Sequence, residues 1–245
     1  ESLYKFNTTS AEVLGMYQIN FHSQVALGFN GSQETYNFRE GATRPEVPLN
    51  VSANKATAKL LFTYNKLTYH HQYISGFKSD LNLQYVQSSN PILPNFLIGR
   101  NDFLYFKRIG KTGNWANRVR VGSATNSSSP FAPFAADNNI NVRGVGNTID
   151  RGTAVLVVNT EFRQTFFLKR GICFQGNIFI DAGTWRQPGG SFEDFGRMGN
   201  LKLYPGLGFR LISTKVSNAV LRVDYGWGVL PNASKGLVFG IGQYF

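Results

Sequence analysis

The sequence NVRGVGNTIDRGTAVLVVNTEFRQTFFLKRGICFQGNIFIDAGTW, residues 141–185, joins a polar loop to two segments in which apolar and polar side chains alternate. The alternation runs along 155–162 and 174–182, and a period of two residues predicts a β-strand in each. On this period Glu161 lies opposite the apolar face of its strand, and Asp181 lies on the less apolar face of the next. If the two strands form a hairpin, the two carboxylates lie close together on one interior face.

Arg143, on the loop before these strands, is the candidate cation for the two carboxylates. Two neighbouring anions repel each other unless a cation sits between them. A planar guanidinium can serve both through charge-assisted, bidentate hydrogen bonds, which a lysine cannot do in the same geometry. The alternative is that Arg143, Glu161 and Asp181 are solvated residues of ordinary hairpins.

The same alternation continues along 206–211, 218–228 and 236–245, where one face is aliphatic and aromatic and the other carries glycine and charge. A soluble β-sandwich and a membrane β-barrel both show this pattern. Aromatic side chains gather at strand ends, as in the girdles of membrane barrels, and favour the barrel. These residues are Trp185, Tyr204, Tyr225, Trp227, Tyr244 and Phe245. No apolar run approaches the roughly eighteen residues of a membrane-spanning helix.

The predicted connections alternate between short and long, as in outer-membrane barrels, where short turns face the periplasm. Short turns are expected at 110–113, 166–171 and 214–217, and long connections at 38–54, 88–98, 125–150, 186–201 and 229–235. Strands are expected at 12–20, 21–35, 55–67, 74–87, 99–109, 114–124, 151–165, 172–185, 202–213, 218–228 and 236–245, with residues 3–9 as a further short strand. We therefore predict an all-β fold, a single transmembrane antiparallel β-barrel domain over residues 1–245 with about twelve strands and both termini in the periplasm.

The distribution of basic residues along the chain argues against a nucleic-acid-binding protein. The formal net charge is +11, but lysine and arginine are dispersed, whereas nucleic-acid binders cluster them on one face. Dispersed basic residues suit a polar lumen and anionic lipid head groups, so we expect membrane lipids and no nucleic acid as partners. The expected lumen-facing basic residues are Arg118, Arg120, Arg210 and Arg222. The single cysteine, Cys173, excludes an internal disulfide and a cysteine metal site.

The sequence was also searched for the motifs of an enzyme active site. His22, His70 and His71 are the available histidine bases, and none lies in a motif with a nucleophile. The GxSxG and HExxH motifs and a phosphate-cradling loop are missing. We expect no catalytic residue, no metal and no cofactor.

The order VRG, TEFR, FIDAGTW, GLGFR, RVDYG and a final aromatic residue resembles the C-terminal half of BamA superfamily barrels, over about residues 100–245. This group includes BamA, TamA and the secretion porin FhaC. The resemblance implies that the VRG loop folds into the barrel lumen, with Arg143 bound to Glu161 and Asp181 and with Val142 and Gly144 completing the loop tip. It also implies the outer membrane of a Gram-negative bacterium. An aromatic residue usually follows VRG, whereas Val145 stands here, and Gln243 is polar where an apolar residue is preferred.

By this resemblance the protein would insert or translocate other proteins, as a short barrel-only member without POTRA modules. A weak seam between the first and last strands, with Gly240, Gly242 and Phe245 in the last, would open for a client strand to pair. Partners would be client outer-membrane proteins and either a separate periplasmic protein or a second copy in a homodimer. The alternative function is a passive outer-membrane pore that prefers anions.

Overall fold

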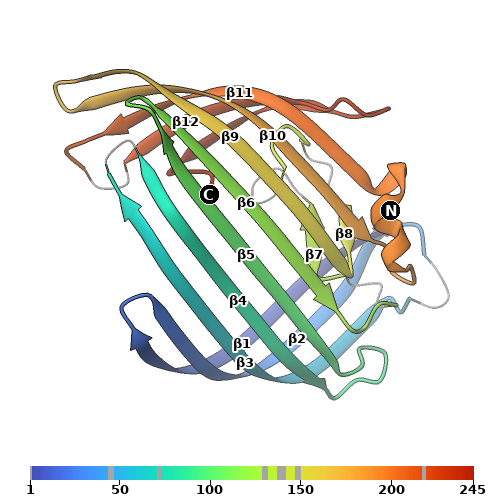
Figure 1. Cartoon of the computed structure of the whole chain (residues 1–245). Coiled ribbons are helices and arrows are strands. Elements are labelled where there is room, and N and C mark those ends of the chain that lie inside the picture. The colour runs from blue at the N-terminus through green and yellow to red at the C-terminus, as the bar shows by residue number, and fades with distance from the viewer. Residues whose placement is uncertain are drawn as a thin grey trace.

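The computed structural model describes residues 2–43, 47–70, 73–128, 132–136, 142–146, 150–216 and 219–245. Its main feature is an eleven-stranded antiparallel sheet in which neighbours in the chain pair, with β6 next to β9 (Figure 1). The strands are β1 (Ser2–Asn20), β2 (Ser23–Gly41), β3 (Asn50–Tyr69), β4 (Ile74–Ser88), β5 (Phe96–Ile109), β6 (Gly113–Ala124), β9 (Ala154–Lys169), β10 (Ile172–Arg186), β11 (Leu201–Ser213), β12 (Val220–Trp227) and β13 (Lys235–Ile241). A second sheet pairs β7 (Phe134–Ala136) with β8 (Asp150–Gly152).

The main sheet is curled, so that β1 to β3 lie across from β9 to β11 and the C-terminal end of the chain lies inside the curve (Figure 1). Within the described residues, β1 pairs with β2 alone and β13 pairs with β12 alone. The sheet therefore has two free edges in the part of the chain that the structure describes.

The two faces of the sheet have opposite character. On the outer face Ile178 and Phe239 are 64% and 73% exposed, whereas Glu161 and Arg210 on the inner face are 1% exposed. Soluble proteins usually show the reverse distribution of apolar and charged side chains. The alternation therefore turns charge inward and apolar side chains outward. None of the helices in the described residues has the length and apolar character needed to cross a membrane.

Most predicted strands are confirmed. Those expected at 74–87, 114–124 and 172–185 correspond to β4, β6 and β10 with ends shifted by a residue at most. The separate strand at residues 3–9 is wrong, because Tyr4 to Gln18 pair with β2 in one register and form one continuous strand. Within the described residues the main sheet consequently has eleven strands, one fewer than the twelve expected.

The connections alternate as expected, with short turns at one end of the main sheet and longer segments at the other (Figure 1). The one expected at 38–54 is shorter, since β2 ends at Gly41 and β3 begins at Asn50. The one expected at 125–150 contains β7 and reaches β8. Two short 3-10 helices, η1 (Phe192–Gly196) and η2 (Met198–Asn200), lie in the connection after β10.

The end of the chain departs from the predicted alternation. The expected strand 236–245 ends at Ile241, and Gly242 has φ +89°, in the left-handed region that favours glycine. The period of two that puts Leu237, Phe239 and Ile241 on the apolar outer face predicts the same face for Phe245. Phe245 instead packs against the buried inner cluster of Ile74, Phe106 and Ala116. The turn at Gly242 breaks the period of two, so the prediction for Phe245 is wrong.

Candidate functional site

The loop tip at residues 142–146 lies against the inner face of the main sheet. Val142 and Val145 are fully buried in an apolar cluster. The other members of that cluster are Ala124, Phe134, Val155, Val157 and Tyr204. A Cβ atom on Gly144 would lie 2.5 Å from the carbonyl oxygen of Gly226 on β12, so only glycine allows this approach.

Arg143 is fully buried and bonded to both predicted carboxylates. Its Nε and Nη2 donate to Asp181 at 2.8 and 2.9 Å, and its Nη1 donates to Glu161 at 2.7 Å. The backbone N–H of Arg143 also donates to Asp181, at 2.9 Å. Asp181 therefore holds both the side chain and the backbone of the loop tip.

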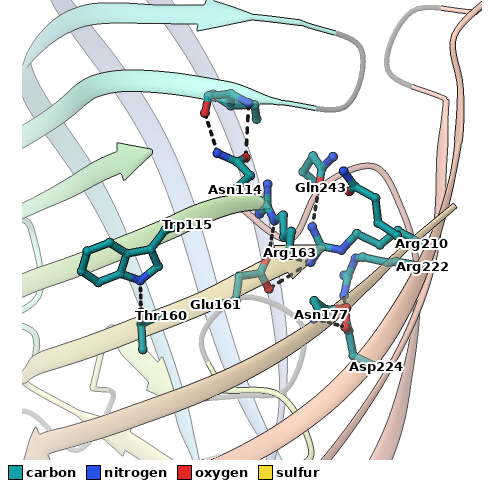
Figure 2. Close-up of polar contacts among 12 residues, drawn as sticks. Asn114, Trp115, Thr160, Glu161, Arg163, Asn177, Arg210, Arg222, Asp224 and Gln243 are labelled. Atoms are coloured by element: carbon teal, nitrogen blue, oxygen red, sulfur yellow. Dashed lines mark hydrogen bonds and ion pairs between the residues drawn. The ribbon is translucent and has the colours of Figure 1, made fainter. Parts of the chain in front are cut away.

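Glu161 on β9 is shared by three arginines. Besides Arg143, it accepts from Arg163 Nε and from Arg210 Nη2, the latter at 2.7 Å to Oε1 and 2.9 Å to Oε2 (Figure 2). Arg163 lies two residues along the same strand, and Arg210 comes from β11. The carboxylate thus joins the loop, β9 and β11.

A third carboxylate, Asp224 on β12, completes the group. It accepts from Arg222 Nη1 at 2.8 Å and from Asn177 Nδ2 at 3.1 Å (Figure 2). Arg143 Nη1 lies 3.7 Å from it. We call four arginines and three carboxylates the arginine cluster: Arg143, Arg163, Arg210, Arg222, Glu161, Asp181 and Asp224. Each is at most 9% exposed, and positive charges outnumber negative ones by one. Because a buried unpaired ion costs several kcal/mol, each member depends on the others.

Aromatic rings cover both the Arg143 guanidinium and its neighbours. The ring centroid of Phe179 lies 3.5 Å from Arg143 Cζ, and that of Tyr244 lies 4.4 Å from it. Such cation–π contacts are strongest in desolvated sites. By the family resemblance, an aromatic residue is expected at the position of Val145. In this chain the aromatic contacts to Arg143 come from β10 and from the end of the chain.

The remaining expected basic residues also lie on the inner face. Arg118 Nε donates to Asn159 Oδ1 at 2.9 Å, and Arg120 Nη2 donates to Asp102 at 2.9 Å. Sequence reasoning did not single out Arg163 or Asp224. It placed Tyr244 among the aromatic residues of a girdle at the strand ends, but Tyr244 is buried against arginines on the inner face. Arg163 follows Glu161 by two residues, and Asp224 follows Arg222 by two residues. The alternation along a strand therefore places each of them on the same face as its neighbour, and this pattern could have identified both.

The other predicted positions lie at the sheet edge and the turns. Gly240 is on β13 opposite Arg222, and a Cβ there would meet that guanidinium at 2.6 Å, so glycine leaves room for the arginine. His22 lies in the β1–β2 turn and His70 follows β3, whereas His71 lies outside the described residues. In the described part of the chain, no three His, Cys, Asp or Glu side chains are placed to hold a metal ion.

Gly144→Ala is expected to destabilise the fold by about 3 kcal/mol, through left-handed strain and a clash with the β12 backbone. The matched control is Gly146→Ala, which also has positive φ but meets no atom within 4 Å and should cost about 1 kcal/mol. Urea titration of the folded fraction in detergent micelles, followed by the gel mobility of unheated samples, measures both. Equal losses would show that the contact between Gly144 and Gly226 contributes nothing.

No protein-family model matches this sequence, and no curated protein sequence matches it. Solved structures do match its fold. The crystal structure of BamA from Haemophilus ducreyi lacking POTRA domains 1-3 is similar with a TM-score of 0.67 and 11% sequence identity. The likeness covers 96% of this chain and 53% of that chain, so the present chain spans about half of its length. At this identity, the similarity shows a BamA-like β-barrel fold.

Proposed function

We propose that a chain with this BamA-like barrel fold acts in the outer membrane of a Gram-negative bacterium and assists the insertion or translocation of other proteins. It does so as one transmembrane domain with both termini on the periplasmic side, and it performs no bond chemistry. The observation that carries the proposal is the pair of free sheet edges, formed by β1 and β13 in the described part of the chain.

A free edge in a membrane has a physical consequence. Backbone N–H and C=O groups that face lipid without a partner cost several kcal/mol each. β1 has 19 residues and β13 has 7, so β13 can cover only part of β1. Outward side chains of β1 such as Val13 and Tyr17, 77% and 69% exposed, place its edge in the apolar layer. A client strand can satisfy this edge by β-augmentation.

The loop tip at residues 142–146 stiffens the part of the main sheet that lies next to the free edge of β13. Arg143 binds Glu161 on β9 and Asp181 on β10, while Gly144 lies against Gly226 on β12. Val142 and Gly144 serve as the packing and close-approach residues of this lock. We propose that the lock keeps β9 to β12 rigid while the edges exchange partners.

The proposal includes lipids of the outer membrane and client outer-membrane proteins as partners. A periplasmic partner, either a separate protein or a second copy of this chain, would deliver the client. A passive pore is not favoured, because Arg210 and Arg222 are bonded to Glu161 and Asp224, and Arg118 and Arg120 to Asn159 and Asp102.

The test is the rate at which a client barrel folds into liposomes that contain this protein, with planar-bilayer conductance measured in parallel. We expect faster client folding than in protein-free liposomes and little steady current. Large steady currents without any acceleration would instead support the pore.

Met16→Lys is expected to slow assisted client folding about five-fold, corresponding to roughly 1 kcal/mol, because a charge at a sheet edge opposes strand addition. Met16 is on β1 and 72% exposed, so the change leaves the arginine cluster intact. The matched control is Met198→Lys in η2, where methionine is 63% exposed and distant in the chain from either edge strand. If both variants behave alike, the β1 edge is not where clients pair.

A further inference from the structure

Residues 242–245 leave the edge of the main sheet and enter its concave side. The backbone N–H of Gly242 still donates to the Val220 carbonyl at 2.7 Å. The left-handed conformation of Gly242 then turns the chain inward. Gln243 Oε1 accepts from Arg210 Nη1, a member of the arginine cluster (Figure 2).

The side chain of Tyr244 is surrounded by three arginine guanidiniums. It is 8% exposed, and its ring centroid lies 4.4 Å from Arg143 Cζ, 4.9 Å from Arg222 Cζ and 5.3 Å from Arg118 Cζ. Each of these arginines is held by another inner-face residue, namely Asp181, Asp224 and Asn159 in turn. The sheet and loop therefore fix the cations that surround the ring.

Phe245 enters a neighbouring apolar site on the opposite wall of the curled sheet. It packs against Ile74 of β4, Phe106 of β5 and Ala116 of β6, with the rings of Phe106 and Phe245 at 6.3 Å. The guanidiniums of Arg118 and Arg163 lie 5.3 and 5.8 Å from its ring. Three residues thus connect β13 to strands on the far side of the main sheet.

We infer that the inner face carries a binding site for an extended peptide with two consecutive aromatic side chains, and that residues 243–245 fill this site in cis. The site has a polar subsite for the glutamine amide, a cationic subsite for the first ring and an apolar subsite for the second. Its walls come from the loop tip and from β4, β5, β6, β9, β11 and β12, whereas its occupant is a short segment after the last strand. An occupant that shares so few residues with the walls can be replaced by an equivalent peptide.

Occupancy of the site is coupled to the loop, because Tyr244 rests on the same guanidinium that binds Glu161 and Asp181. A peptide that displaces residues 243–245 would release the end of β13 while preserving the contacts to Arg143. The inference goes beyond the proposed function and does not rest on it, since peptide binding is measured without a client.

The experiment measures the fluorescence anisotropy of a labelled Gly-Gln-Tyr-Phe peptide with barrels in detergent micelles. A variant lacking residues 243–245 should bind the peptide saturably, at least ten-fold more tightly than the full chain does. A Gly-Gln-Ala-Ala peptide should bind the same variant at least ten-fold more weakly. Adding Phe106→Ala to the truncated chain should weaken binding of the aromatic peptide about five-fold, the scale of roughly 1 kcal/mol for an aromatic contact.

A second variant, Tyr244→Ala with Phe245→Ala, keeps the chain length and empties both ring subsites. It should bind the aromatic peptide as the truncated chain does. Equal binding to the full and truncated chains, no saturable binding to either variant, or equal affinity for the two peptides would overturn the inference. Failure of both variants to fold would also overturn it, because an exchangeable segment is not required for folding.

Discussion

Glu161→Ala is expected to lower the free energy of unfolding by about 5 kcal/mol, because it leaves three buried guanidiniums without their shared carboxylate. Arg143, Arg163 and Arg210 all donate to Glu161, and none of the three is more than 1% exposed. The change also raises the excess positive charge of the arginine cluster from one to two, because four arginines then face two carboxylates. Urea titration of the folded barrel in phospholipid vesicles, followed by tryptophan fluorescence, measures the loss.

The matched control is Glu34→Ala on β2. Glu34 also lies on a strand, but it binds one cation, Lys55, together with the Tyr36 hydroxyl, which donates to it at 3.0 Å, and its side chain is 16% exposed. Losing the contact to one partly exposed cation should cost less than leaving three fully buried guanidiniums without their carboxylate. A loss for Glu161→Ala no greater than for Glu34→Ala would contradict the central role given to Glu161.

Arg143→Ala is expected to destabilise the barrel by about 3 kcal/mol, less than Glu161→Ala. The alanine removes the two guanidinium hydrogen bonds to Asp181 but keeps the one from the backbone N–H of residue 143, and Glu161 keeps Arg163 and Arg210. The remaining cluster then has equal numbers of positive and negative groups, which limits the electrostatic cost. The same titration in vesicles gives the free energy, and protease cleavage near residues 142–146 reports whether the loop tip has left the wall.

Two variants control this prediction. Arg100→Ala removes an arginine whose side chain is 47% exposed and whose carboxylate partner is 3.7 Å away, so it should change stability by less than about 0.5 kcal/mol. Arg143→Ala with Asp181→Asn should recover about 1–2 kcal/mol, because no ion is then left unpaired at that position. If the double variant is as unstable as Arg143→Ala, the loss arises from packing of the loop tip and not from the orphaned carboxylate.

The inner-face positions of Glu161 and Asp181 could be predicted because a strand alternates its side chains between two faces. Across the β9–β10 ladder, Glu161 lies opposite Phe179 and Asp181 opposite Asn159, so the two carboxylates are close neighbours on one face. The structure brings Arg143 to both of them. That this contact acts as a lock during protein assembly stays a prediction.

Other parts of the site depend on information that alternation does not contain. The approach of Asn177 to Asp224 requires β11 to lie between β10 and β12 with a small residue in between, and Gly208 supplies it. Tyr244 and Phe245 follow the backbone turn at Gly242, so a period counted along the strand misplaces Phe245. The strand count failed for a related reason: polar residues in the first part of β1 interrupt the pattern of faces but not the backbone ladder.

The number of strands in the main sheet determines how its two edges can be joined. Every ladder from β1 to β13 is antiparallel, and eleven is odd, so β1 and β13 run in the same direction. Direct contact between them would have to be a parallel pair, with slanted hydrogen bonds and slightly less stability per residue. An all-antiparallel ring instead needs an odd number of additional strands between the two edges. One incoming strand, from a client or from another stretch of polypeptide, satisfies this condition, whereas a single two-stranded hairpin does not.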